Sequence, residues 1–182
     1  MRLCGLLLSA VMCAAPAIAQ EPVCEGTVSN DVGEVIASVD ARGATIVSWA
    51  VERREGVGQE SDNFARPGLL IDFTMSNDRV LGTPRQVEVL ISRFSESERK
   101  PPPPLSSVSV QVKAGGEPIV WPGDDSRDGS AKLIARLKES WPNEVVVDLV
   151  DKAGKLVASA TFDLSKRPVV EKLAREARAK CG

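Results

Sequence analysis

The residues that could carry chemistry in this chain are serine, lysine and the carboxylates, because the chain contains no histidine. That removes the commonest general base, the usual hydrolytic triads and the commonest zinc ligand. The sequence contains no G-x-S-x-G turn, no P-loop and no dinucleotide-binding glycine pattern. A Ser–Lys pair or paired carboxylates remain open, because distance along the chain does not give distance in space. Glu96 and Glu98 are a candidate pair of carboxylates, and we interpret them as part of a solvated loop.

One acidic segment resembles the start of a calcium-binding loop. Asp124, Ser126 and Asp128 place oxygen atoms at alternate positions, and a glycine follows them. The twelfth position of such a loop needs a bidentate Glu, but here it is Ala135. We therefore interpret the segment as an acidic turn that starts a helix, where negative charge is favourable. On these grounds we expect no metal site, no catalytic site and no cofactor.

Aromatic residues are too scarce to favour carbohydrate or nucleic-acid recognition. They make up 4% of the chain, and tyrosine is absent. Trp49, Trp121 and Trp141 each lie in or beside an apolar stretch, so core packing is the expected role of all three. The net charge of −2 also argues against nucleic acid and anionic membranes as partners.

The first residues have the features of a secretory signal peptide. A short positive start is followed by an apolar core, and residues 17–19 form an A-x-A cleavage signal before Gln20. No other stretch approaches the roughly 18 apolar residues that a membrane-spanning helix needs. We therefore expect residues 1–19 to be removed, and residues 20–182 to form a single exported domain in the periplasm or outside the cell.

Export changes the chemistry expected of the cysteines. Cleavage would remove Cys4 and Cys13 and leave Cys24 near the new N-terminus and Cys181 near the end of the chain. In an oxidising compartment, a disulfide is the expected fate of such a pair. Free or intermolecular thiols are the competing interpretation. A redox role is weaker still, because no C-x-x-C motif is present.

The elements that would position these residues are mostly strands. Apolar residues recur with a period of two along residues 144–150 and 156–164, and a turn that contains Gly154 lies between the two segments. This pattern predicts a β-hairpin in which residues 156, 158, 160, 162 and 164 share one face. A helix should follow over residues 165–181, and another over 130–140, capped by Ser130 or Asp128. Residues 53–67 are polar and contain two glycines, so they read as a surface loop.

About eight strands at short spacing predict a mainly β fold, either an antiparallel β-sandwich or a barrel-like body, with a short helix and a C-terminal helix.

The last third of the chain resembles the C-terminal part of exported proteins of the invasion-associated locus B type. The resemblance lies in residues 132–137, 151–155 and 160–165, which precede the terminal helix. It implies an all-β periplasmic protein linked to the bacterial envelope and to host-cell entry. The additional cysteines expected in that family are absent here, and no functional residue is carried over.

Together these observations predict a non-catalytic binding or cell-envelope accessory protein, with a protein or an envelope component as its partner. A small periplasmic hydrolase that uses Ser, Lys or carboxylates is the alternative. A cluster of perturbed carboxylates or lysines in a deep pocket would favour the enzyme, and a shallow exposed surface would favour the binding protein.

Overall fold

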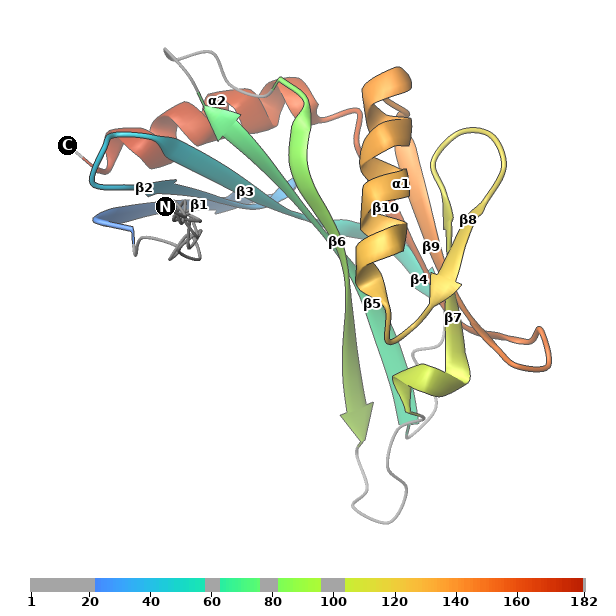
Figure 1. Ribbon diagram of the computed structural model, residues 1–182. Coiled ribbons are helices and arrows are strands. Elements are labelled where there is room, and N and C mark those ends of the chain that lie inside the picture. Colours follow the sequence, from blue (N-terminus) through green and yellow to red (C-terminus); the bar gives the residue numbers. More distant parts are fainter. Residues whose placement is uncertain (1–21, 58–62, 76–81, 96–103, 182) are drawn as a thin grey trace, which may run out of the picture.

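The computed structural model describes residues 22–57, 63–75, 82–95 and 104–181, which form ten strands, two α-helices and one 3-10 turn (Figure 1). The predicted signal peptide lies outside these residues. The strands are β1 (Cys24–Asn30), β2 (Gly33–Val39), β3 (Thr45–Val51), β4 (Arg53–Val57), β5 (Asn63–Met75), β6 (Pro84–Ser95), β7 (Val108–Lys113), β8 (Ile119–Pro122), β9 (Glu144–Asp151) and β10 (Leu156–Asp163). The 3-10 turn is η1 (Leu105–Ser107).

The strands form two antiparallel five-stranded sheets, which confirms the predicted mainly β, sandwich-like fold. The first sheet has the order β1-β2-β3-β5-β6, and the second has the order β4-β10-β9-β7-β8. Each sheet buries one face. On the first sheet the buried face is formed by Val35, Val47, Trp49, Ile71 and Phe73, and on the second by Val110, Val147, Leu149, Ala160 and Phe162. Residues of both sheets and both helices belong to one cluster of buried apolar side chains.

The chain passes from the first sheet to the second almost without a break, because Glu52 alone separates β3 from β4. This corrects the prediction of a surface loop over residues 53–67. Part of that segment is β4, which pairs with β10 at the edge of the second sheet, and part is the first half of β5. Polar and charged residues are common on edge strands, where they discourage pairing with other chains, so composition alone misled the prediction.

The predicted hairpin is confirmed as β9 and β10, with one exception. The register shifts between Leu156 and Ala158, and Leu156 is exposed instead of sharing the buried face of the later residues. A bulge adds one residue to one strand, so the alternation before it is displaced by one position. Simple period-two counting cannot detect that displacement.

Helix α1 (Ser126–Glu139) contacts β6 of the first sheet and β8 of the second. Leu133 and Leu137 are its buried residues, and Gly129 lies against Trp121, where a Cβ atom would come within 2.1 Å of the indole ring. The cap is Asp125, which accepts a hydrogen bond from the backbone N–H of Arg127 at 3.2 Å. The predicted caps Ser130 and Asp128 are wrong, because the helix begins one turn earlier than expected.

Helix α2 (Arg167–Ala179) lies along β1 and β2, as the upper left of Figure 1 shows. Val170, Leu173, Ala174 and Ala177 form its buried stripe. The helix approaches β1 so closely that a Cβ atom on Gly26 would lie 1.9 Å from the carbonyl oxygen of Ala177. Just past the helix end, Cys181 is bonded to Cys24 at the start of β1, as predicted, with 5.7 Å between the Cα atoms.

Candidate functional site

The acidic segment that resembles a calcium loop forms the start of helix α1. Asp125 caps the helix, and Asp128 pairs with Lys132 at 2.6 Å across one helical turn. The interpretation as an acidic turn before a helix is therefore confirmed. Within the part of the chain that the structure describes, no group of three or more His, Cys, Asp or Glu residues could hold a metal ion.

The tryptophans lie in or beside the core. Trp49 and Trp121 are almost completely buried, and the indole N–H of Trp49 donates to the carbonyl of Val32 at 2.9 Å. Trp141 is half-buried, and the guanidinium carbon of Arg167 lies 4.5 Å from the centre of its ring. This cation–π contact joins the start of α2 to the segment before β9. Core packing is confirmed for Trp49 and Trp121.

A serine, a lysine and a carboxylate meet on the outward face of the second sheet. Ser159 donates its hydroxyl to Asp148 at 2.6 Å, and the Lys113 ammonium donates to the other carboxylate oxygen at 2.8 Å. A serine nucleophile needs a neighbouring base that accepts its proton. Here the lysine donates to the carboxylate, so the arrangement neutralises and satisfies the buried Asp148. Glu96 and Glu98 lie outside the described residues.

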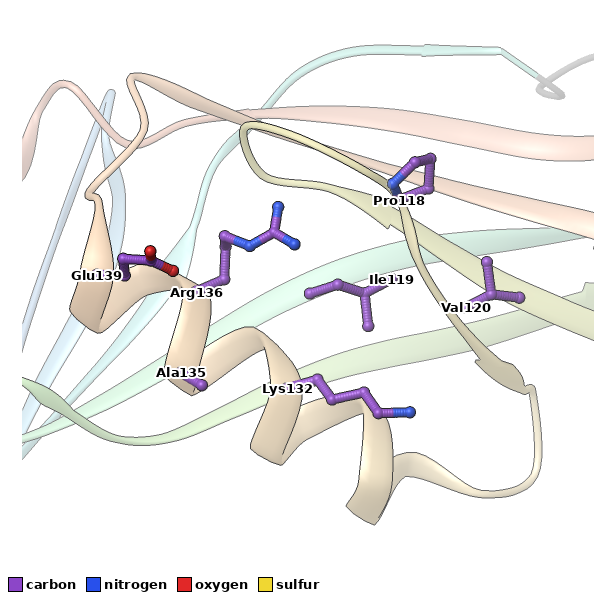
Figure 2. A pocket seen from close by; sticks show the side chains of 7 residues that line it. All are labelled: Pro118, Ile119, Val120, Lys132, Ala135, Arg136 and Glu139. Carbon is purple, nitrogen blue, oxygen red and sulfur yellow. The ribbon is translucent and has the colours of Figure 1, made fainter.

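A groove of about 370 Å³ lies between α1 and the edge strand β8 (Figure 2). Its two basic side chains are already engaged. Arg136 donates to the backbone carbonyls of Gly115 and Glu117, and Lys132 is paired with Asp128. The groove therefore owes its shape to contacts that anchor the loop before β8, and we do not assign it a ligand.

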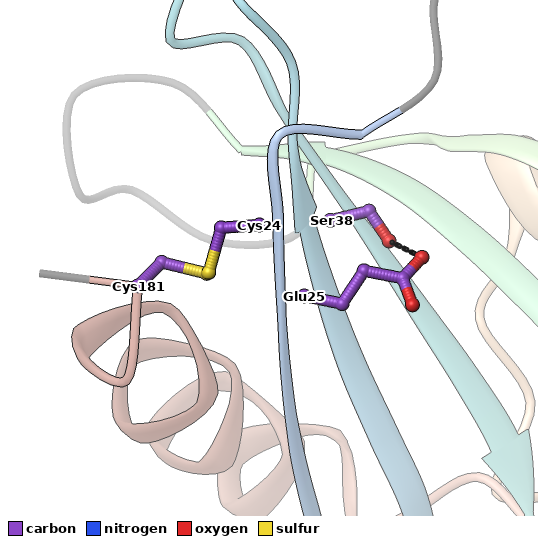
Figure 3. The surroundings of a disulfide bond; sticks show 4 residues. All are labelled: Cys24, Glu25, Ser38 and Cys181. Atoms are coloured by element: carbon purple, nitrogen blue, oxygen red, sulfur yellow. Dashed lines mark hydrogen bonds between the residues drawn. A yellow bond between two sulfur atoms is a disulfide. The ribbon is translucent and has the colours of Figure 1, made fainter.

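The stronger candidate is the outward face of the first sheet, which we call the open face. Figure 3 shows Cys24 and Glu25 pointing to opposite sides of β1, with Cys24 on the side of α2. Because side chains alternate along a strand, Glu25 and its neighbours in register lie on the side away from the helix and the core. The open face consists of two registered rows, Glu25–Ser38–Ile46–Thr74 and Thr27–Ile36–Ser48–Asp72–Gln86.

A pocket of about 390 Å³ occupies one end of the open face. Four of its lining residues are the polar side chains Glu25, Ser38, Ser48 and Thr74, which come from four neighbouring elements of one sheet. The Ser38 hydroxyl donates to Glu25 at 3.2 Å, which orients the carboxylate (Figure 3). The pocket is completed by Pro22, Asp40, Ala44, Thr45, Ile46 and Arg85.

Arg85 reaches this pocket because β6 is irregular. Phe73 pairs with Pro84, but its neighbour Asp72 pairs with Gln86, so Arg85 is an extra residue on β6. Bulges of this kind re-aim side chains and are frequent next to functional sites. Among the described residues, Arg85 has no hydrogen-bonded or ion-paired partner. The bulge thus adds an available positive charge to a face that otherwise carries carboxylates.

Asp72 lies near the middle of the open face, opposite Ser48 on β3. Its Oδ1 atom is buried and accepts no hydrogen bond from any residue that the structure describes. Burial raises the pKa of Asp72, and the negative charge of Glu88 raises it further. A hydrogen bond from the Ser48 hydroxyl and the positive charge of Arg85 lower it, but by less than burial and Glu88 together raise it. A buried acceptor without a donor is costly, so this carboxyl group is the least satisfied one described on the open face.

The sequence alone does not identify this site. Its signal was present, since Ser48 lies between a valine and a tryptophan and Asp72 lies between an isoleucine and a phenylalanine. Ser48 and Asp72 are neighbours only because β3 pairs with β5 in this register. Arg85 reaches the pocket only because of the bulge in β6. Neither the register nor the bulge can be read from the spacing of residues.

No family model, curated protein or solved structure shows a significant match to this chain. None of the helices in the described part of the chain is long and apolar enough to cross a membrane.

Proposed function

We propose that this protein is an exported, non-catalytic binding or cell-envelope accessory protein, and that the open face of the first sheet is its binding surface. Export is supported by the signal-peptide pattern of residues 1–19 and by the Cys24–Cys181 disulfide, which is typical of oxidising compartments. The resemblance to exported proteins of the invasion-associated locus B type agrees with this location.

The observation that carries the proposal is the composition of the open face together with its exposure. Helix α2 packs against the opposite side of β1 and β2, and α1 packs against β6 and β8. The open face carries apolar side chains, such as Ile36 and Ile46, beside polar side chains such as Asp72. A shallow face with mixed apolar and polar groups is typical of recognition.

The non-catalytic part of the proposal rests on the geometry of the available serines. Ser159 donates to a carboxylate that is already paired with Lys113, and Ser38 donates to Glu25. Neither hydroxyl donates to a lysine amine, which is the base of a Ser–Lys pair.

The test compares two matched substitutions in the purified protein. Thr74→Arg places a bulky charge in the pocket of the open face, and Ser109→Arg places the same charge on the outward face of the second sheet. Both variants should melt within a few degrees of the wild type. Immobilised wild type and Ser109→Arg should retain the same component of an envelope extract and rebind it after its purification, whereas Thr74→Arg should not.

Equal retention by both variants would show that the open face is not the binding surface. Chemical conversion of the retained component by the wild-type protein would contradict the non-catalytic assignment.

A further inference from the structure

The charges around the pocket of the open face are separated by sign. Glu25 on β1 and Asp40 after β2 are at one end, and Arg85 on β6 is at the other. Asp40 already accepts from the backbone N–H groups of Arg42 and Ala44 through one oxygen, which fixes its side chain. A ligand that fills the pocket therefore meets negative charge on one side and positive charge on the other.

The separation sets the length of that ligand. Four strand spacings lie between β1 and β6, which corresponds to roughly 19 Å between their backbones. The side chains of Glu25 and Arg85 both extend into the space between, since both line the pocket. Three extended residues span about 10 Å, so a tripeptide fits within this separation.

The groups between the two ends are neutral. Ser38, Ser48 and Thr74 provide hydroxyls that can both donate and accept hydrogen bonds, and Ile46 provides an apolar contact. This lining suits amide groups with small side chains. A purely anionic ligand would face Glu25 and Asp40, and a purely cationic ligand would face Arg85.

We infer that the pocket of the open face binds a short peptide with free termini, its ammonium group beside Glu25 and its carboxylate on Arg85. This inference rests on the proposed function and names the ligand class of the same site. The bulge at Arg85 then has a role, because it turns the guanidinium toward the terminal carboxylate, which a bidentate pair recognises well.

Calorimetric titration with three probes tests the inference. Trialanine carries both charges, N-acetyl-trialanine lacks the ammonium, and trialanine amide lacks the carboxylate. Trialanine should bind, and each blocked peptide should bind at least about tenfold more weakly, as expected for the loss of a hydrogen bond to a charged group.

Two substitutions then assign each end of the ligand. Arg85→Gln should weaken trialanine at least about tenfold but leave the affinity for trialanine amide nearly unchanged, while Arg85→Lys should restore part of the loss. Glu25→Gln should weaken trialanine but not its N-acetyl form. The controls Arg175→Gln and Glu139→Gln alter exposed residues of α2 and α1 and should change nothing.

Absence of binding by trialanine at millimolar concentration would overturn the inference, as would equal binding of all three probes. Equal losses for free and blocked peptides in Arg85→Gln would also overturn it, because the variant would then act through the fold. If Thr74→Arg abolishes retention of an envelope component while trialanine does not bind, the proposed function stands and the peptide inference is wrong.

Discussion

Removal of the Cys24–Cys181 disulfide should lower the stability of the protein substantially without changing its fold. The bond closes a loop with a sequence separation of 157 residues. The chain-entropy model assigns such a loop about 5 kcal/mol at 25 °C, and measured values are often smaller, so we expect a loss of about 2–5 kcal/mol. The Cα separation of 5.7 Å falls inside the normal range for a disulfide.

The native contacts around the bond should survive its loss. Helix α2 keeps its buried stripe of Val170, Leu173, Ala174 and Ala177 against the first sheet. The effect of the bond therefore acts mainly through the unfolded chain, which gains freedom when the link is removed. The last turn of α2 should loosen first, because the bond holds a chain end that lies just beyond the helix.

Urea unfolding of the oxidised wild type and of the Cys24→Ser/Cys181→Ser variant measures the loss. With an m-value of about 2 kcal/mol/M, the midpoint should fall by roughly 1–2.5 M. Alkylation of the unreduced wild type under denaturing conditions should label neither cysteine. Two reactive thiols in that sample, or an unchanged midpoint in the variant, would refute the reasoning.

Three further predictions follow from other contacts. Gly129→Ala should destabilise the protein by about 1–3 kcal/mol in urea unfolding, because its Cβ atom would overlap the Trp121 ring. Asp72→Asn should gain stability relative to the wild type between pH 3 and pH 7. The folded wild type holds the Asp72 proton more tightly than the unfolded chain does, because burial raises the pKa of Asp72 above the ordinary value of 3.8. The wild type therefore loses stability as the pH rises from that value through the raised pKa, and the Asn variant does not. Arg167→Lys should lower the midpoint of thermal unfolding by a few degrees, because lysine loses the flat stacking on the Trp141 ring.

Each of these predictions has a control or a contradicting result. Gly68→Ala meets only ordinary contacts at 3.5 Å and should cost much less than Gly129→Ala. Arg175→Lys alters an exposed position of α2 and should leave the melting temperature unchanged. A constant stability difference between Asp72→Asn and the wild type at all pH values would show that Asp72 is not titrating in the buried position described above.

The open face shows how far sequence patterns reach. The alternation of Leu69, Ile71, Phe73 and Met75 in the sequence defines which side of β5 faces the core. The same alternation places Asp72 on the other side. What it could not supply was the neighbour of Asp72 on the adjacent strand, and therefore the pocket and the buried Asp72 Oδ1 atom that accepts no hydrogen bond from the described residues.

Local physical chemistry allowed the sequence by itself to predict the β-rich class, the hairpin of β9 and β10, the C-terminal helix, and the pairing of Cys181 with Cys24. Each depends on the period of the apolar residues, on the turn residues or on the number of cysteines, and all of these are visible in the sequence. The predicted helix reached residue 181, whereas α2 ends at Ala179 and Cys181 lies just beyond it. The tertiary structure alone decided that residues 53–57 form an edge strand, that β6 bulges at Arg85, and that Glu25, Ser48 and Arg85 line one pocket. Those outcomes depend on which strands pair and in which register, and that choice is made by contacts between residues far apart in the chain.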